Sequence, residues 1–359
     1  MKITMIGISG SGKTTYMAAL HEVLGINQVK NYFITPTAGD MTKGIKRFGQ
    51  FGDLSFAKTD SNENIVYKFP EATSQTTFWS FDLLHNSLRN SQTVCNFEWI
   101  DYRGGLLQNI FTDLDHMPDD SRTRDLTAHI SFSNAVFLFA DSVMLTKTKN
   151  PSERKILTGA RLINQWLRLF SVHYPNRNLT VMIILSKADS DLIEDEWKED
   201  NYAKLVKAGS ECFDEVVRLS HLSKPNWICG IVPIGAIGNG HLKSNIIKDK
   251  PLSINTAIIP YPDPMNIEHP LFFCLGQTLL KMRDTAALDI VDYQRRIEDI
   301  MKRSPLWQNI LPVADRTQNP REITEQLILK VKQEHELLKL FVPHARQLIA
   351  YALEKVTVL

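Results

Sequence analysis

The chain has 359 residues, of which 43% are hydrophobic and 23% are charged. This composition is typical of a globular protein, and at about 150 residues per domain the length indicates either two domains or one enlarged domain. Its 41 Lys and Arg residues balance its 40 Asp and Glu residues, so the net charge of +1 argues against a broad basic face for nucleic acid or anionic membranes, without excluding a local patch.

The amino-terminal residues carry the strongest motif. Residues 2–7 predict a short strand and residues 14–24 predict a helix, and between them residues 7–14 (GISGSGKT) match the phosphate-binding pattern G-x-x-x-x-G-K-[ST] in its strand, loop and helix context. Glycines let the backbone curl so that its N–H groups face phosphate oxygens, and the helix N-terminus adds a positive dipole end. We expect Lys13 to bind the β- and γ-phosphates and Thr14 to bind Mg²⁺. The residues expected to bind the triphosphate are Gly7, Ser9, Gly10, Ser11, Gly12, Lys13, Thr14 and Thr15.

Residues 76–83 and 94–100 predict a pair of strands, and the second leads into Asp101 and, three residues later, Gly104. An Asp at the carboxyl end of a strand beside the phosphate loop can hold Mg²⁺ through a water, while a glycine at that spacing lets its N–H approach the γ-phosphate. Asp101 and Gly104 match these two roles. Because Asp-x-x-Gly is a common pattern, an ordinary strand that ends in a turn is the alternative.

Residues 180–185 form a continuous apolar run, which is typical of a buried parallel strand. The next residues, 186–189 (SKAD), resemble the guanine-specificity motif Asn/Thr-Lys-x-Asp of the translation-factor and Ras-like (TRAFAC) class of P-loop GTPases. The resemblance implies that Asp189 accepts hydrogen bonds from guanine N1 and N2 and that Lys187 lies along the base. Ser186 departs from the Asn of that class, and the alternative is a strand leading into an acidic helix cap.

Two further apolar runs, at residues 135–141 and 227–236, complete the predicted strands. In the same class a Ser-Ala turn after the last of these strands offers a backbone N–H to guanine O6, and the pair Gly235-Ala236 resembles it, so Ala236 is the candidate. Alternating strands and helices predict an α/β fold of the P-loop NTPase (Ras-like) type, with a mostly parallel sheet, helices on both faces and the nucleotide at the carboxyl edge.

The resemblance covers about residues 1–285, and we assign residues 1–270 to a GTPase domain. The interval from Lys13 to Asp101 is longer than a compact GTPase needs, which predicts an insertion within about residues 25–72. Its richness in Gly, Asn, Asp and Ser predicts loops with short strands.

The class uses a switch threonine that closes over Mg²⁺ and the γ-phosphate. The candidates are Thr73, Thr76 and Thr77, and Thr73 is the first choice because it leaves a short approach to the following strand. Thr35 and Thr37 fit this role only if the insertion follows the switch. An ordinary loop residue is the alternative for each of them.

Many members of the class orient the attacking water with a Gln directly after the Asp-x-x-Gly glycine, where this chain has Gly105. We therefore expect slow hydrolysis without a partner, because the barrier is lowered by positioned polar groups. Arg103 is the candidate catalytic residue in place of the Gln, with Gln108 as a second. The alternatives are that both are surface residues of the switch, or that a partner protein supplies an arginine.

The carboxy-terminal quarter is predicted to be helical. Residues 271–301 and 328–353 carry apolar residues three and four positions apart, which predicts two helices that pack as an antiparallel pair. Pro343 predicts a kink or a boundary between two helices. We assign residues 271–359 to a helical extension that is either a lid on the sheet or an arm for a partner or for self-association.

Together these features predict a GTP-binding molecular switch that binds GTP or GDP with Mg²⁺, hydrolyses GTP slowly and acts through a protein partner or an activating protein. The alternatives are a P-loop ATPase or phosphotransferase, and a scaffold that nucleotide stabilises without hydrolysis. The insertion and helical tail also resemble, in general layout, bacterial GTPases that work with partner proteins in multi-component systems such as antiphage defence.

The remaining features predict a cytoplasmic protein. The four cysteines form no Cys-x-x-Cys pair, which favours buried thiols over disulfides. No apolar run approaches the roughly 18 residues of a membrane span, and the amino terminus is a strand that leads into a glycine loop, unlike a cleavable signal. The spacing of Cys and His residues does not suit zinc.

Overall fold

The computed structural model describes a large part of the chain as two compact units. The first unit comprises Met1–Cys274 and Tyr351–Leu359, and the second comprises Leu275–Ala350. The residues described are 1–26, 28–37, 58–59, 65–66, 77–86, 91–101, 129–174, 177–222, 227–236, 238, 242–243, 256–257, 263–302 and 320–359.

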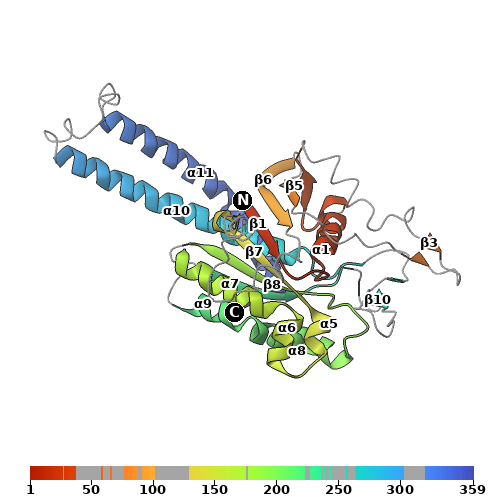
Figure 1. Ribbon diagram of the computed structural model, residues 1–359. Helices are drawn as coiled ribbons and strands as arrows, with labels where there is room; N and C mark the ends of the chain where they lie inside the picture. The colour runs from red at the N-terminus through yellow and green to blue at the C-terminus, as the bar shows by residue number, and fades with distance from the viewer. Residues whose placement is uncertain are drawn as a thin grey trace. The chain divides into compact units, whose positions relative to one another are not determined.

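A mixed sheet of eight strands forms the centre of the first unit (Figure 1). In spatial order its strands are β12 (Thr357–Val358), β9 (Trp227–Pro233), β8 (Leu179–Ser186), β7 (Ala135–Asp141), β1 (Lys2–Ile6), β6 (Ser91–Asp101), β5 (Thr77–Asn86) and β2 (Tyr32–Pro36). Neighbours from β9 to β6 run parallel, and β12, β5 and β2 pair antiparallel. The predicted α/β class with a mostly parallel sheet is confirmed.

The central strands are buried along their whole length. Every residue of β7 and of β8 is buried, which explains why both strands are apolar without alternation up to their polar last residues, Asp141 and Ser186. The strand pair β5 and β6 is antiparallel as expected, with one irregularity between Leu83 and Leu84. Both strands extend further than the apolar pattern indicated, because backbone pairing continues through the polar residues at their ends.

The pairing of β2 and β12 with the two edges of the main sheet was not predicted. β2 lies within the segment expected to be an insertion and pairs with β5, while β12 pairs with β9 at the other edge. Two short antiparallel pairs stand apart from the main sheet. They are β3 (Lys58–Thr59) with β4 (Ile65–Val66), and β10 (Leu242–Lys243) with β11 (Thr256–Ala257).

One face of the sheet packs against a layer of helices. Trp166 and Phe170 stack with ring centroids 5.3 Å apart and belong to the same core cluster as Val136 and Leu138 of β7. The helices of this side are α5 (Ser142–Thr146), α6 (Pro151–Leu157), α7 (Ala160–His173), α8 (Asp195–Cys212) and α9 (Asp214–His221).

The opposite face carries an aromatic core, so helices cover both faces as predicted. Tyr16 lies between Trp99 of β6 and Phe139 of β7, with ring centroids 5.7 Å and 5.5 Å away. Tyr32 of β2 meets Phe272 at 5.6 Å. The helices of this side are α1 (Lys13–Leu20), the π-helix η1 (His21–Ile26) and the first residues of α10 (His269–Lys302).

The helix predicted over residues 14–24 changes its pitch partway. The α-helical turns end at Leu20 and a π-helix continues to Ile26. Gly25 lies against the ring of His21, where a Cβ would stand 2.9 Å from Cδ2, so this turn is shaped around the histidine.

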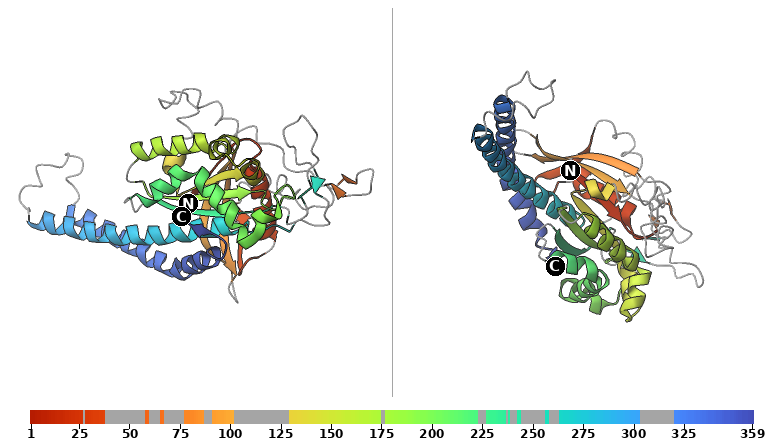
Figure 2. Two further views of the ribbon diagram at one scale, coloured as in Figure 1. Left: turned by 90° about the horizontal axis from the view of Figure 1, so that it is seen from below. Right: turned by 60° about the vertical axis from the view of Figure 1, so that its left-hand side comes forward.

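The second unit is a pair of long helices, α10 and α11 (Pro320–Ala352), which Figure 2 shows side by side in both views. Their close approach depends on Gly276, where a Cβ would stand 2.8 Å from the carbonyl oxygen of Ala345 and 2.6 Å from Ile349 Cγ1. The predicted helical pair is thus confirmed. The boundary considered at Pro343 is absent, because α11 continues through that residue. No helix in the described part of the chain is long and apolar enough to cross a membrane.

The residues before and after the second unit contact each other within the first unit. Tyr351 Oη donates a hydrogen bond of 2.6 Å to Glu268 Oε1, and the Tyr351 ring stacks on His269 at 4.6 Å. Burial raises the pKa of Glu268, but the neighbouring His269 and the hydrogen bond from Tyr351 outweigh it, so that this pKa lies below its usual value.

We expect Gly159→Ala to destabilise the fold by about 2 to 4 kcal/mol, since it combines backbone strain with overpacking. Gly159 has a φ of 74°, and a Cβ there would overlap Ile8 Cγ2 in the loop after β1. Urea unfolding measures the loss. Gly10→Ala is the control, because Gly10 has a φ of 78° but no atom within 4 Å of its Cβ position. Equal losses in the two variants would contradict the importance of the Ile8 contact.

Candidate functional site

The candidate site lies at one edge of the sheet, where several residues singled out by sequence come together. Strands β1, β6, β7 and β8 are parallel, so their carboxyl ends share an edge. Gly7 follows β1, and Asp101, Asp141 and Ser186 are the last residues of β6, β7 and β8. β1 lies between β6 and β7, where the chain changes direction across the sheet, and such a switch point is where open α/β sheets bind ligands.

The loop after β1 is shaped by its glycines. Gly10 and Gly12 have φ values of 78° and 86°, which favour glycine, and Gly12 leads directly into α1. A Cβ at Gly7 would stand 2.5 Å from Ser11 Oγ and 2.9 Å from Phe139 Cβ. Main-chain N–H groups at a helix N-terminus form a ready anion site. Ser9 is exposed, and Thr15 lies in the first turn of α1.

Lys13 is folded into this loop. Its side chain is buried, with 5% of the residue exposed, and Nζ donates to the carbonyl oxygens of Gly7 at 2.8 Å and Ile8 at 3.2 Å. Burial lowers the pKa of Lys13 to about 8, and the nearby Asp101 charge opposes that shift. Carbonyl dipoles therefore hold the ammonium in a buried position, where its attraction to a bound anion is less weakened by water.

We expect GTP binding to take up roughly half a proton or more at pH 8.5, because a triphosphate stabilises the charged form of Lys13 and raises its pKa from about 8. Without ligand, the lysine of the unfolded chain keeps its proton up to its usual pKa of 10.5. The cost of burying the ammonium in the folded protein is therefore present below pH 8 and is relieved between about pH 8 and 10.5. Calorimetry in buffers of different ionisation enthalpy measures the uptake, and its absence at pH 8.5 would contradict this pKa.

Thr14 and Asp101, the two residues predicted to hold a metal, lie next to each other. Thr14 Oγ1 donates to Asp101 Oδ2 at 3.1 Å, and Asp101 is buried, with 2% exposed. A hydroxyl and a carboxylate oxygen are hard ligands of the kind that Mg²⁺ accepts alongside phosphate and water, so these residues fit that ion. In the described residues no group of three or more His, Cys, Asp or Glu side chains could hold a metal.

The turn after β8 holds both residues of the proposed base motif. Lys187 has a φ of 59°, and its Nζ lies 2.5 Å from Asp141 Oδ2. Asp189 is buried, with 1% exposed, and its Oδ2 accepts a hydrogen bond of 2.9 Å from the N–H of Gly238. Ala236 lies partly buried in the segment between Gly238 and the end of β9.

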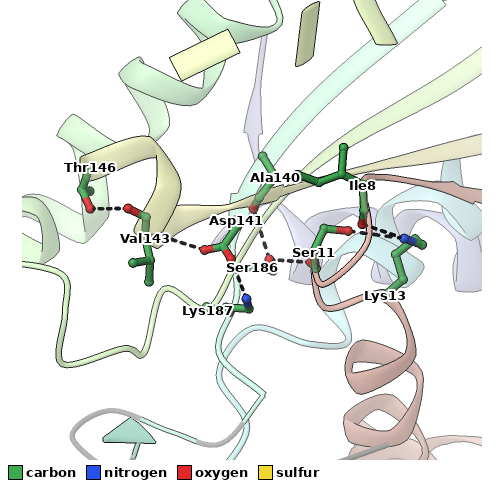
Figure 3. A network of polar contacts seen from close by, with 9 residues as sticks. All are labelled: Ile8, Ser11, Lys13, Ala140, Asp141, Val143, Thr146, Ser186 and Lys187. Atoms are coloured by element: carbon green, nitrogen blue, oxygen red, sulfur yellow. Dashed lines mark hydrogen bonds and ion pairs between the residues drawn. The ribbon is translucent and has the colours of Figure 1, made fainter. Parts of the chain in front are cut away.

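Ser186 has a clear structural role although it departs from the Asn of the motif. Its Oγ donates to the carbonyl oxygens of Ser11 at 2.7 Å and Ala140 at 3.2 Å, so it joins the ends of β8 and β7 to the glycine loop (Figure 3). A Cβ at Gly12 would stand 3.3 Å from Ser186 Cβ. The small side chain therefore fits the close approach of loop and strand.

The described residues place only some of the other expected site residues. Thr73, Arg103 and Gly104 fall outside the described residues. Thr35 is in β2, and Thr37 Oγ1 donates to the carbonyl oxygen of Ser80 in β5. Asp141 was not predicted as a site residue; its signal is an acidic residue at the end of an otherwise apolar strand.

No protein-family model matches the chain, and no curated protein matches it. Among solved structures it is similar to the signal recognition particle receptor SRb-GTP/SRX complex from Chaetomium thermophilum, with a TM-score of 0.35 and 13% sequence identity. The match covers 67% of this chain and 92% of that chain. The function is therefore inferred from the geometry of the site.

Proposed function

We propose that this protein is a GTP-binding molecular switch that hydrolyses GTP slowly with Mg²⁺ and acts through a protein partner. The observation that carries the proposal is the conjunction at one sheet edge of a glycine-shaped loop, the Lys13 ammonium folded onto it, and the Thr14 hydroxyl 3.1 Å from the Asp101 carboxylate. A triphosphate and its metal need this set of groups.

The triphosphate half of the site has the following roles in this proposal. Main-chain N–H groups of the loop and of the α1 N-terminus bind phosphate oxygens, and Lys13 bridges the β- and γ-phosphates. Thr14 and Asp101 hold Mg²⁺, which supplies charge neutralisation. The backbone of Gly104 approaches the γ-phosphate, and Thr73 and Arg103 are the proposed switch and water-orienting residues.

The base half uses the turn after β8. Asp189 accepts the guanine N1 and N2 protons, Lys187 lies along the base and the N–H of Ala236 binds O6. Because Asp189 Oδ2 already accepts from the Gly238 N–H at 2.9 Å, guanine binding and the segment around Gly238 are coupled through one carboxylate.

In this proposal the switch loops become ordered when GTP binds and relax after hydrolysis, and this change alters the affinity for the partner. We propose residues 1–270 as the GTPase domain, with the insertion in about residues 25–72, and residues 271–359 as the helical extension that a partner engages. Slow turnover without the partner follows from Gly105 at the position of the usual Gln.

Calorimetry of the full chain with GTP, GDP and ATP in the presence of Mg²⁺ tests the proposal, together with release of inorganic phosphate. We expect binding of GTP and GDP, a clear preference over ATP, and slow phosphate release. Equal binding of ATP and GTP would favour the ATPase or phosphotransferase instead. Binding without any phosphate release, with or without partner proteins, would favour a scaffold.

A further inference from the structure

A buried carboxylate outside the predicted motifs stands beside the base turn. Asp141 is the last residue of β7, and only 5% of it is exposed. Its two oxygens have different partners. Oδ1 accepts from the N–H of Val143 at 2.9 Å and caps α5, whereas Oδ2 lies 2.5 Å from Lys187 Nζ (Figure 3). The second contact brings together residues 46 positions apart, so it belongs to the tertiary structure and not to the helix cap.

Lys187 is held at both its backbone and its side chain. A left-handed φ of 59° is unfavourable for a lysine, so contacts must hold this backbone in place. The N–H of Ala188 donates to Ile234 O at 2.9 Å, and the N–H of Ser190 donates to Lys187 O at 3.1 Å. The ion pair then fixes the end of the side chain, which is 21% exposed, against an Asp141 side chain that is 7% exposed.

A lysine side chain that is already ordered lowers the entropic cost of ligand binding. The side chain has four flexible bonds, and ordering it opposes binding unless the order already exists. A partly buried pair is less screened by water and salt than a surface pair, so it can supply that order. Ser186 joins the same strand end to Ser11 of the phosphate loop, which places this pair in one polar network with the triphosphate half of the site.

We propose that Asp141 is a positioning residue for nucleotide binding: its Oδ2 holds the Lys187 ammonium so that the lysine stem is already extended across the base site when the nucleotide arrives. This inference rests on the proposed function. Asp141 touches the nucleotide only through Lys187. If it served only to cap α5, its effect on binding would be independent of Lys187.

A double-mutant cycle separates these two roles. The variants are Asp141→Asn, Lys187→Met and the double substitution, each tested for Mg²⁺-GTP affinity by calorimetry. Asn keeps an amide oxygen that can cap α5 but loses the charge. We expect Asp141→Asn to weaken GTP binding about tenfold, which corresponds to about 1.4 kcal/mol, and to have no further effect once Lys187 is Met.

Asp214→Asn is the matched control. Asp214 also accepts a backbone N–H, that of Glu215 at 2.9 Å, and pairs with a lysine, Lys155, at 2.7 Å, but this pair joins α9 to α6 away from the site. Its GTP affinity should equal that of the unmodified protein. A loss of the same size in Asp214→Asn would overturn the proposal.

Additive effects of the two substitutions would also overturn the proposal, because they would show that Asp141 acts without Lys187. Should Asp141→Asn not fold, Asp141→Glu takes its place. It keeps the charge but displaces the carboxylate by one methylene, and the same dependence on Lys187 is expected. If the unmodified protein binds no GTP, the proposed function fails, whereas normal GTP binding with an additive cycle refutes only the role of Asp141.

Discussion

Lys13→Met is expected to reduce the affinity for Mg²⁺-GTP by a factor of about 100 to 1,000. Losing one partner of a buried, hydrogen-bonded charge pair costs about 2 to 5 kcal/mol, and a factor of ten corresponds to about 1.4 kcal/mol. Lys13 is the only group of the described loop that brings a full positive charge to the predicted phosphates, and Met preserves the length and most of the volume of its stem. Calorimetry or nucleotide competition measures the loss.

Two controls make this result specific to the site. Lys204→Met removes an exposed lysine of α8, whose only described ion pair is with Glu196, and should bind GTP normally. Thermal unfolding of ligand-free Lys13→Met should show a folded protein, because methionine suits a site that is 5% exposed. A folded Lys13→Met variant that binds GTP with unchanged affinity would refute the phosphate site.

Asp189→Asn is expected to lower the affinity for GTP about 100-fold or more and to raise the affinity for xanthosine triphosphate. A carboxylate accepts the two N–H groups of guanine, and each hydrogen bond to a charged group contributes about 1.5 to 3 kcal/mol. Xanthine carries a carbonyl in place of the guanine amino group, and the Asn amide can donate to it. Competition among GTP, ATP and xanthosine triphosphate measures the change.

The surroundings of Asp189 make this exchange a clean test. The Asn side chain still offers an oxygen to the Gly238 N–H, which now lies 2.9 Å from Oδ2, so the turn keeps that contact. Asp191→Asn, an exposed residue two positions along the chain, is the control and should leave nucleotide preference unchanged. A folded Asp189→Asn variant that loses GTP without gaining the xanthine nucleotide would indicate that Asp189 is structural.

The buried centre of this fold could be predicted from sequence because its signals are local. Residues 135–140 and 181–185 are apolar without interruption, which is typical of a strand buried on both faces. The strands β2 and β12 could not be predicted in this way. Their five and two residues are held by pairing with β5 and β9, which is a non-local property.

The candidate site shows the same division. Lys13 and Thr14 belong to one contiguous motif, and Asp101 could be added to them because it ends a strand expected beside the phosphate loop. In the structure Thr14 and Asp101 lie 3.1 Å apart. The role of Asp141 and the contact between Ser186 and Ser11 could not be predicted, because no sequence motif marks them. Each depends on two strand ends becoming neighbours only after the sheet forms.

The return of the chain to the sheet after α11 has a mechanical consequence. β12 pairs with Gly230 and Ile231 of β9, the strand that leads to Gly235, and Gly235 forms a two-way bridge with Met265 shortly before α10 begins. The segments before α10 and after α11 are therefore both bonded to residues 230–235, which lie beside the turn after β8. A shift of either Met265 or β12 would therefore act on the same stretch of backbone, residues 230–235 at the end of β9 and in the turn after it.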